Sequence, residues 1–236
     1  MSSNIFIQDT NMTTTAYLKK KLFNPKRAFD IVSSFIGLVL LSPVLLTIAV
    51  LVKLSSKGPV FYRGERAGRF NRPFKIYKFR TMVPDAEKVG GMSTAKGDPR
   101  ITKVGHILRR YKLDELPQLI NVLKGDMSIV GPRPEMPAYT NLYRGEEELI
   151  LTVRPGITDY ASIEFVHLDE VLGSEDADRI YEEKIRPIKN ALRIKYVKEQ
   201  SFWGDIKLIL TTLGAIDRKG CGTFTNTNYV ASTNEK

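Results

Sequence analysis

Two adjacent carboxylates, Asp114 and Glu115, lie in an otherwise strongly basic part of the chain. The surrounding segment, residues 109–137, reads RRYKLDELPQLINVLKGDMSIVGPRPEMP and places arginines such as Arg109 and Arg133 near the acid pair in sequence. Neighbouring carboxylates repel each other, so the pair requires a compensating partner. That partner is either a helix end or a bound group.

Helix capping is the simplest explanation of the acid pair. Pro117 favours the first turn of a helix that stops before Gly125, and the N–H groups and dipole at such a start favour negative charge. The same helix start, with arginines nearby, also suits a phosphate group. Two carboxylates and a diphosphate would repel one another, which implies a bridging cation, most simply Mg²⁺ with Asp114 as a candidate ligand.

The spacing of the two acids predicts different roles for them. Adjacent side chains near a helix start point in different directions, so they do not match two carboxylates that flank one glycosidic bond. One ionised carboxylate could attack phosphorus, as in enzymes that form an aspartyl phosphate, while the other orients it, accepts a proton or holds the metal. The candidate cations for phosphate or nucleotide groups are Lys78, Arg80, Arg109, Arg133 in the segment GPRPEMP and Arg154 in the segment VRPG.

Composition narrows the class of partner and of metal. The 236 residues are 42% hydrophobic, which suffices for an ordinary core, and the formal net charge of +10 favours an anionic partner: nucleic acid, an anionic membrane surface or a phosphorylated substrate. A single cysteine, Cys221, cannot form an internal disulfide, and two histidines do not make a zinc site. We therefore expect a reducing compartment and a metal bound by oxygen.

An apolar run from Ile31 to Val52 contains no charged residue. As one helix it would be about 33 Å long, close to the thickness of a bilayer core, but Ser42-Pro43 at its middle predicts a kink. Lysines and arginines flank both ends, which by the positive-inside rule places both ends on the cytoplasmic side. A re-entrant hairpin, with Ser42 bonding a freed carbonyl, satisfies both observations; a kinked single span and a buried core helix remain alternatives.

The remaining segments are predicted from local patterns. Alternating basic and aromatic residues after Gly58 predict a short β-hairpin; they could also bind single-stranded nucleic acid, which the adjacent apolar run disfavours. Helices are expected over residues 102–112, 117–124, 146–153 and 180–213, the last broken near Pro187 and Ser201, with an acidic loop over 164–178. The final helix is amphipathic, as an interfacial helix or an ordinary core-facing helix would be.

Seven ordered blocks of the sequence resemble one known family. They are KRAFD, LLSPVLL, GPVFYRGERAGR, PFKIYKFRTM, DPRITKVGHILRRYKLDELPQLINVLKGDMSIVGPRP, RPGIT and SFWGDIKLIL, and the resemblance runs from about Lys26 to Leu213. This set, in this order, resembles the bacterial sugar transferases, which are polyprenyl-phosphate phosphoglycosyl transferases of the monotopic type. The resemblance therefore covers most of the chain.

The resemblance implies an enzyme that transfers a hexose 1-phosphate from a UDP-sugar to undecaprenyl phosphate, releases UMP and initiates a surface glycan. It implies a Mg²⁺-dependent ping-pong reaction in which Asp114 is the nucleophile and Glu115 its partner. Arg109 would stabilise the transferring or lipid phosphate, and Arg133 the nucleotide end. Ser42-Pro43 would be the bend of a re-entrant hairpin in the bacterial inner membrane, with the catalytic domain on its cytoplasmic face.

Sequence and resemblance together predict an α+β, mainly helical, monotopic membrane protein with a re-entrant helix hairpin, a small β-hairpin and interfacial amphipathic helices. The expected parts are a polar flexible leader (1–24), the hairpin (25–57), the catalytic domain with C-terminal interfacial helices (58–218) and a flexible tail (219–236). The short leader suggests the minimal catalytic form. The expected partners are the UDP-sugar, undecaprenyl phosphate and the lipid bilayer, but not nucleic acid; homo-oligomers are compatible with this prediction.

Some residues depart from the family pattern, and two rival hypotheses remain. Gly64 stands where glutamine is common, Lys112 where serine is common, and Asp159-Tyr160 where Gly-Trp is common, so the sugar is not identified. In one rival, the lipid phosphate attacks directly in a ternary complex and Asp114 only holds Mg²⁺. In the other, the chain is a non-catalytic basic scaffold at the membrane.

Overall fold

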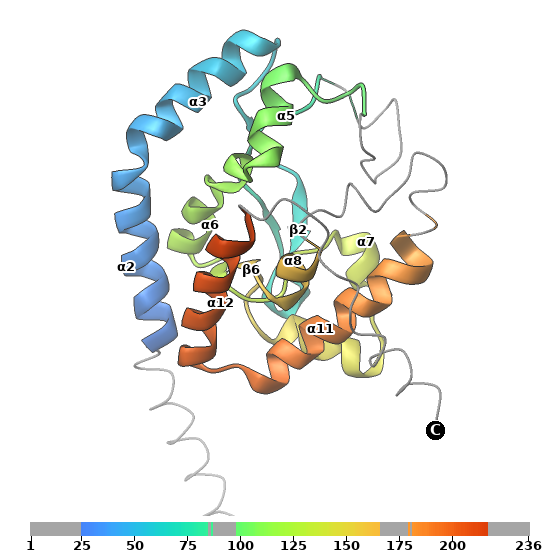
Figure 1. Cartoon of the computed structure of the whole chain (residues 1–236). Helices are drawn as coiled ribbons and strands as arrows, with labels where there is room; N and C mark the ends of the chain where they lie inside the picture. Colours follow the sequence, from blue (N-terminus) through green and yellow to red (C-terminus); the bar gives the residue numbers. More distant parts are fainter. Residues whose placement is uncertain (1–24, 85, 87–97, 166–178, 180, 217–236) are drawn as a thin grey trace, which may run out of the picture.

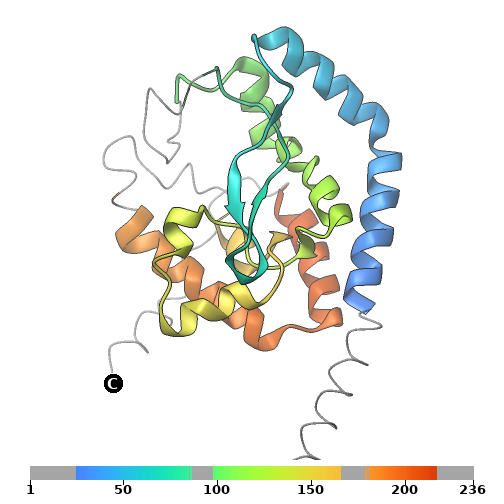
Figure 2. The ribbon, with the colours of Figure 1, turned by 180° about the vertical axis from the view of Figure 1, so that it is seen from behind.

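The computed structural model describes residues 25–84, 86, 98–165, 179 and 181–216. The predicted leader (1–24) and tail (219–236) lie outside the described residues, and so does most of the predicted acidic loop (164–178). The described part is mainly helical and contains three small two-stranded sheets (Figures 1 and 2). The prediction of a mainly helical fold with a small β-hairpin is therefore confirmed.

The apolar run forms two helices, α2 (Pro25–Leu40) and α3 (Ser42–Ser55), which are bent by 64° relative to each other (Figure 1). Proline at the start of α3 lacks the N–H that a continuous helix needs. The Ser42 hydroxyl donates a hydrogen bond of 2.8 Å to the carbonyl of Val39, as the sequence predicts. No single described helix is long and apolar enough to cross a bilayer; by length and composition the bent pair together could.

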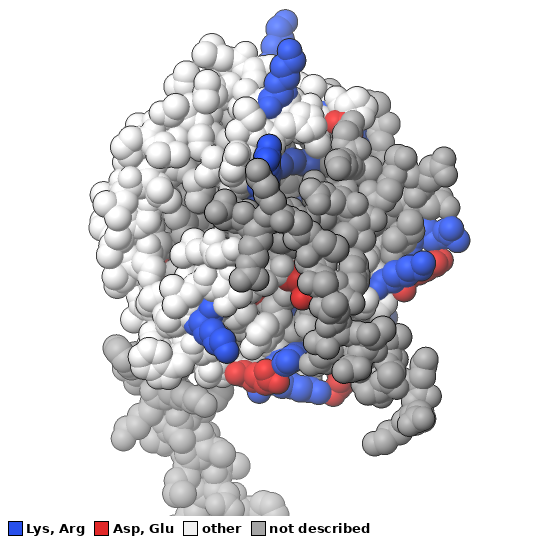
Figure 3. All heavy atoms as spheres, in the orientation of Figure 1, with Lys and Arg blue, Asp and Glu red and all other residues white. Residues whose placement is uncertain are grey.

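The exposed surfaces of α2 and α3 are apolar, which reverses the usual arrangement of a surface helix. Asp30 and Ser34 of α2 are buried instead, because α2 packs its polar side against α6 and strand β5. In Figure 3 the left side of the molecule, formed by α2 and α3, shows almost no charged side chain. The exposed apolar residues of the two helices are Ile31, Val32, Phe35, Ile36, Val39, Leu40, Val44, Leu46, Val50, Leu51 and Leu54.

Four short strands form the predicted hairpin, which Figure 2 shows from behind. The inner pair is β2 (Glu65–Ala67) with β3 (Pro73–Lys75), and the outer pair is β1 (Phe61–Tyr62) with β4 (Lys78–Phe79); both pairs are antiparallel. Phe61 and Phe79 stack opposite each other with ring centroids 5.4 Å apart. The outer strand β4 then ends beside the acid pair.

Short helices surround the acid pair. Helix α5 (Lys103–Arg110) begins at Thr102, whose side chain accepts a hydrogen bond from Gly105 N, and 3-10 helix η2 (Leu113–Glu115) follows. Lys112 between them has a left-handed backbone with φ of 55°. Helix α6 (Gln118–Lys124) ends at Gly125, whose φ of 93° suits glycine. The two predicted helices in this region are thus confirmed, with ends shifted by one or two residues.

A parallel strand pair supports the loop that contains Arg133. Strand β5 (Ser128–Val130) pairs with β6 (Gly156–Thr158), and a Cβ atom on Gly156 would lie 2.0 Å from Gly131 N, so the two segments approach too closely for a side chain. Between the strands lie α7 (Pro137–Thr140) and η3 (Gly145–Thr152); α8 (Tyr160–Glu164) follows β6. The helix expected over 146–153 is present as the 3-10 helix η3.

The C-terminal helical region breaks at Ser201, as the sequence predicts, whereas near Pro187 it continues and only changes its helix type. A π-helix, η4 (Tyr181–Ile185), leads into α11 (Arg186–Glu199), which has proline in its first turn, and α12 (Phe202–Ile216) follows. The Ser201 hydroxyl accepts a hydrogen bond of 3.1 Å from Gly204 N and so caps α12. Helix α12 buries Leu208 but leaves the apolar side chains of Trp203, Leu210 and Leu213 exposed. One side of α12 therefore faces the core, and another side presents an apolar surface.

Candidate active site

The 3-10 helix η2 presents Asp114 and Glu115 in a single turn between α5 and α6. Neither η2 nor α6 has a side-chain hydrogen bond that caps its first turn. The capping explanation of the acid pair is therefore not supported by the structure. The two carboxylates differ sharply in their surroundings, as their partners show.

Glu115 is held by two cations from distant parts of the chain. Arg133 binds both carboxylate oxygens, with Nη1 2.9 Å from Oε2 and Nη2 in contact with Oε1, and Lys78 Nζ lies 2.9 Å from Oε1. Burial alone would raise the pKa of Glu115, but the charges of Arg133 and Lys78 outweigh burial and hold that pKa well below its usual range. Glu115 is therefore the carboxylate that stays ionised.

Asp114 is buried, with 7% of its surface exposed, and no hydrogen bond or ion pair to it is found in the described part of the chain. Burial raises the pKa of Asp114, and the charge of Glu115 raises it further. The nearby cations Lys78, Arg109 and Arg133 offset only part of this rise. Asp114 thus has free lone pairs and a poorly stabilised anion, as a nucleophile or metal ligand requires.

Lys78 is placed by the β-hairpin, at the first position of β4. Burial lowers the pKa of its ammonium, although the charge of Glu115 opposes this change. Lys78, η2 and the loop after β5 thus contribute to one site from three segments that are far apart in sequence. Two of the predicted phosphate-binding cations, Lys78 and Arg133, lie directly at the acid pair.

The other predicted cations occupy different positions. Arg109 donates from Nε to the Thr81 hydroxyl at 2.9 Å and is close enough to the site to lower the pKa of Asp114. Arg80 is buried and donates to the carbonyl of Ser56 at 2.7 Å, at the end of α3. Arg154 donates to the carbonyl of Gly125 at 2.9 Å, at the end of α6. The contacts found for Arg80 and Arg154 are with backbone carbonyls at the ends of α3 and α6. Phosphate binding by either residue therefore stays a prediction.

Asp159 supports the Arg133 loop and was not recognised as a site residue from the sequence. Its carboxylate accepts a hydrogen bond of 3.1 Å from Arg133 N and two from Ser162, at 2.6 Å from N and 2.7 Å from Oγ. Buried Arg193 of α11 lies 4.0 Å from Asp159 and 2.7 Å from Glu135. The pattern Asp-x-x-Ser signals the helix cap, but nothing in the sequence signals the contact with Arg133.

The donor atoms at Asp114 fit a magnesium ion. The described residues contain no group of three or more His, Cys, Asp or Glu side chains that could hold a metal. Mg²⁺, however, is usually held by one or two carboxylates, with phosphate oxygens and water completing its shell. The carboxylate of Asp114 lacks a hydrogen-bonding partner in the described part of the chain and meets that requirement, whereas both oxygens of Glu115 are already bound.

The chain is similar to known proteins over most of its length. The profile of the family described as "Bacterial sugar transferase" matches residues 20–219. A UDP-glucose:undecaprenyl-phosphate glucose-1-phosphate transferase of Escherichia coli K12 is 45% identical over 192 residues, which is 80% of this chain and 39% of that protein.

Two further relatives extend this result. A UDP-N-acetylgalactosamine-undecaprenyl-phosphate N-acetylgalactosaminephosphotransferase of Aeromonas hydrophila is 39% identical over 81% of this chain and 43% of that protein. An exopolysaccharide production protein of Rhizobium meliloti is 35% identical over 81% of this chain and 84% of that protein. The chain thus spans less than half the length of the first two relatives.

Proposed function

The chain belongs to the bacterial sugar transferase family, and from this premise we propose that it transfers a sugar 1-phosphate from a UDP-sugar to undecaprenyl phosphate, releasing UMP. The observation that carries the proposal is the contrast within the acid pair. Glu115 is neutralised by Arg133 and Lys78, while Asp114 has no such partner among the described residues and has a raised pKa, owing first to burial and then to the charge of Glu115.

The proposed reaction has two displacement steps at one phosphorus atom. A carboxylate oxygen of Asp114 attacks the phosphorus that carries the sugar; the bond to the UMP oxygen breaks, and UMP leaves with that electron pair. An oxygen of undecaprenyl phosphate then attacks the same phosphorus, and the bond to Asp114 breaks, which restores the carboxylate. Lys78 and Arg133 lie where they can stabilise phosphate oxygens, and Glu115 fixes both cations in place.

We propose Mg²⁺ as the cofactor, with Asp114 as the protein residue that would hold it. When bound, the ion would neutralise phosphate charge. Dialysis against EDTA is expected to stop UMP release, and added Mg²⁺ is expected to restore it. The measurement is UMP release from purified protein in detergent at a series of free Mg²⁺ concentrations. Full activity in excess EDTA would contradict the cofactor assignment.

We propose that α2 and α3 form a re-entrant hairpin in the inner membrane, with the remaining domain on the cytoplasmic face. Three features support this topology: the 64° bend, the hydrogen bond from Ser42 at that bend, and the exposed apolar surface of both helices. A polyprenyl phosphate keeps its tail in lipid and presents only its head group at the interface. An interfacial active site is therefore suited to this acceptor.

The topology can be tested by cysteine labelling. In a Cys221→Ser background, Pro25→Cys places a single exposed thiol at the first residue of α2, and Lys57→Cys places one just after α3. A re-entrant hairpin places both thiols in the cytoplasm. A membrane-impermeant maleimide is then expected to label both in inverted vesicles and neither in intact spheroplasts. Labelling of only one of the two in spheroplasts would indicate a single span.

The donor can be identified by measuring UMP release across a panel of UDP-sugars, with and without undecaprenyl phosphate. Relatives named for UDP-glucose and for UDP-N-acetylgalactosamine are similarly distant, so both belong in the panel. Lipid-dependent UMP release from one or two sugars is the expected result, and the product would initiate a surface glycan such as an exopolysaccharide. Failure of every sugar, including rare amino sugars, would favour the scaffold hypothesis.

The pH dependence of UMP release should report the ionisation of Asp114. Burial raises the pKa of Asp114 and the charge of Glu115 raises it further, and only the ionised form attacks phosphorus. Bound Mg²⁺ would oppose this rise, so the loss of activity on lowering the pH is expected to occur at higher pH at limiting Mg²⁺ than at saturating Mg²⁺. Glu115→Gln removes one cause of the raised pKa, so this acid limb should move to lower pH. An unchanged limb in that variant would contradict the assignment.

A further inference from the structure

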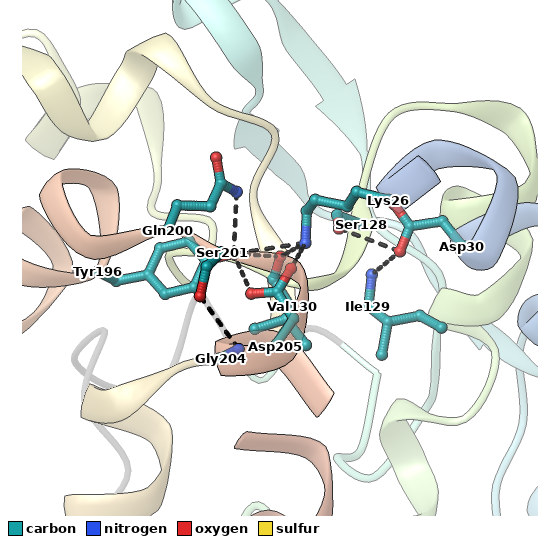
Figure 4. Close-up of polar contacts among 10 residues, drawn as sticks. All are labelled: Lys26, Asp30, Ser128, Ile129, Val130, Tyr196, Gln200, Ser201, Gly204 and Asp205. Atoms are coloured by element: carbon teal, nitrogen blue, oxygen red, sulfur yellow. Dashed lines mark hydrogen bonds and ion pairs between the residues drawn. The ribbon is translucent and has the colours of Figure 1, made fainter. Parts of the chain in front are cut away.

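A buried polar cluster joins the start of α2 to the rest of the molecule (Figure 4). Lys26 of α2 donates hydrogen bonds from Nζ to the carbonyl of Val130 at 2.8 Å, to the Tyr196 hydroxyl at 3.4 Å and to the carboxylate of Asp205. A lysine ammonium has three donors, so this side chain is fully satisfied. We call Lys26, Tyr196 and Asp205, together with the Val130 carbonyl, the polar junction.

The other members of the polar junction contact one another. The Tyr196 hydroxyl lies 2.9 Å from Asp205 Oδ1 and 3.0 Å from the Val130 carbonyl, and it accepts a hydrogen bond of 3.0 Å from Gln200. Burial raises the pKa of Tyr196, and the charge of Asp205 raises it further, so the phenol stays neutral and can donate. With 4% of the Asp205 side chain exposed, this is a desolvated, directional set of contacts.

A second contact fixes α2 against the same strand. One oxygen of the buried Asp30 carboxylate accepts hydrogen bonds from Ile129 N at 3.0 Å and from the Ser128 hydroxyl at 3.1 Å. Lys26 also donates to the Val130 carbonyl, so α2 contacts all three residues of β5. Alongside, the rings of Phe29 and Phe202 meet edge to face at 5.7 Å, which joins α2 to α12.

The polar junction links the apolar-surfaced helices to the strand that leads into the active site. Helices α2 and α12 both carry exposed apolar side chains, and β5 continues through Gly131 and Pro132 to Arg133. Gly131 is held against the β6 segment, because its N–H donates a hydrogen bond of 2.9 Å to the Thr158 carbonyl and a Cβ atom there would lie only 2.5 Å from the Arg154 carbonyl. The position of β5 relative to α2 and α12 therefore sets the position of the active site relative to both helices.

Apolar contact with lipid does not by itself define the orientation of a helix, because the hydrophobic effect is non-directional. Directional, desolvated hydrogen bonds do define an orientation. We propose that Lys26, Tyr196 and Asp205 are positioning residues that fix α12 against α2. They thereby set the depth of both helices in the membrane, and hence the depth of Asp114 relative to the lipid acceptor. The role of the acceptor in this inference rests on the proposed function.

The membrane depth of α12 can be measured without any enzymatic assay. Trp203 is the only tryptophan of the chain, is 78% exposed and lies in the first turn of α12 with Asp205. The full-length protein is reconstituted in phosphatidylethanolamine and phosphatidylglycerol vesicles that contain lipids brominated at successive acyl positions. The quenching of Trp203 at each position reports its depth.

We expect Lys26→Met and Asp205→Asn to shift the position of strongest Trp203 quenching relative to the wild type. The control is Lys198→Met on α11, which breaks the exposed ion pair with Glu146 of η3 and should leave the profile unchanged. Tyr196→Phe removes only a hydroxyl, so it keeps the test valid if a charge variant does not fold. An unchanged profile in every folded variant of the junction would overturn the proposal.

Activity adds a readout that a general loss of stability would not produce. Exchange of labelled UMP into the UDP-sugar needs no lipid, whereas product formation needs the lipid phosphate at the correct depth. The junction variants should retain UMP exchange but lose about 10-fold or more in kcat/KM for undecaprenyl phosphate. A parallel loss of both reactions would overturn the proposal. Absence of both in the wild type would instead refute the proposed function, and the quenching profile would still decide on the junction.

Discussion

Asp114→Asn is expected to reduce lipid-dependent UMP release by about 1,000-fold or more, because an amide cannot replace the attacking carboxylate. The variant should fold normally. Asp114 makes no hydrogen bond or ion pair with the described residues, and its pKa is raised by burial and by Glu115, so a neutral side chain relieves an unfavourable charge. UMP release and the thermal unfolding midpoint, measured on the same preparation, separate lost chemistry from lost structure.

The matched control is Asp126→Asn. Asp126 lies just beyond the end of α6 and accepts a hydrogen bond of 3.2 Å from the side chain of Asn121. It is an acid from the same segment with no hydrogen bond or ion pair to the acid pair among the described residues, and its variant should retain activity. Equal activity of the two variants would remove Asp114 from the mechanism.

The covalent step needs its own measurement, because the ternary-complex hypothesis also requires Asp114. Wild-type protein incubated with a labelled UDP-sugar and no lipid should retain label on the peptide that contains Asp114 after acid quenching. It should also exchange labelled UMP into the donor. Direct attack by the lipid phosphate predicts neither result, so an unlabelled, exchange-inactive enzyme that still forms product with lipid would establish the ternary complex.

Arg133→Lys is expected to lower kcat/KM by about 100-fold, although the charge is kept. Arg133 binds both oxygens of Glu115 through its planar fork, and an ammonium cannot reproduce that geometry. Glu115 would lose the two-point contact with Arg133 and would no longer hold Lys78 and the loop in a fixed arrangement. Steady-state kinetics for the donor and for the lipid phosphate provide the measurement.

Arg144→Lys controls for the general effect of replacing an arginine. Arg144 is exposed and, within the described part of the chain, donates only to backbone carbonyls, at 3.0 Å to Asn141 and 2.7 Å to Tyr143, so its variant should behave as the wild type. A double-mutant cycle of Arg133→Lys with Glu115→Gln should show strong coupling, because the two side chains are in direct contact. Additive effects would mean that Arg133 acts independently of Glu115.

Local signals made several elements predictable. The kink at Ser42-Pro43 follows from proline chemistry, and the observed hydrogen bond from Ser42 to Val39 is the predicted one. Gly125 ends α6 and Ser201 begins α12, both through contacts within a few residues. The helix expected over 146–153 is present as a 3-10 helix, a type that periodicity does not distinguish from a short α-helix. The break expected near Pro187 was wrong, because proline is tolerated in the first turn of a helix.

The candidate site was only partly predictable. The acid pair and its arginine-rich surroundings are visible in sequence, but Arg133 and Arg154 look alike there, since both lie in proline-flanked loops. The fold brings Arg133 to Glu115 and takes Arg154 to the end of α6. Asp159 appeared as a departure from the family pattern, and only the structure connects it with Arg133.

The sequence by itself determined the family, the bend in the apolar run and the identity of the two adjacent acids, because these depend on residue type and on neighbours along the chain. The tertiary structure alone decided which acid is neutralised and which is left without a partner among the described residues. It also joined Lys26 to Asp205, which lie 179 positions apart in the chain. The physical reason is that burial and charge, which set pKa values and orient helices, arise between residues that meet only when the chain is folded.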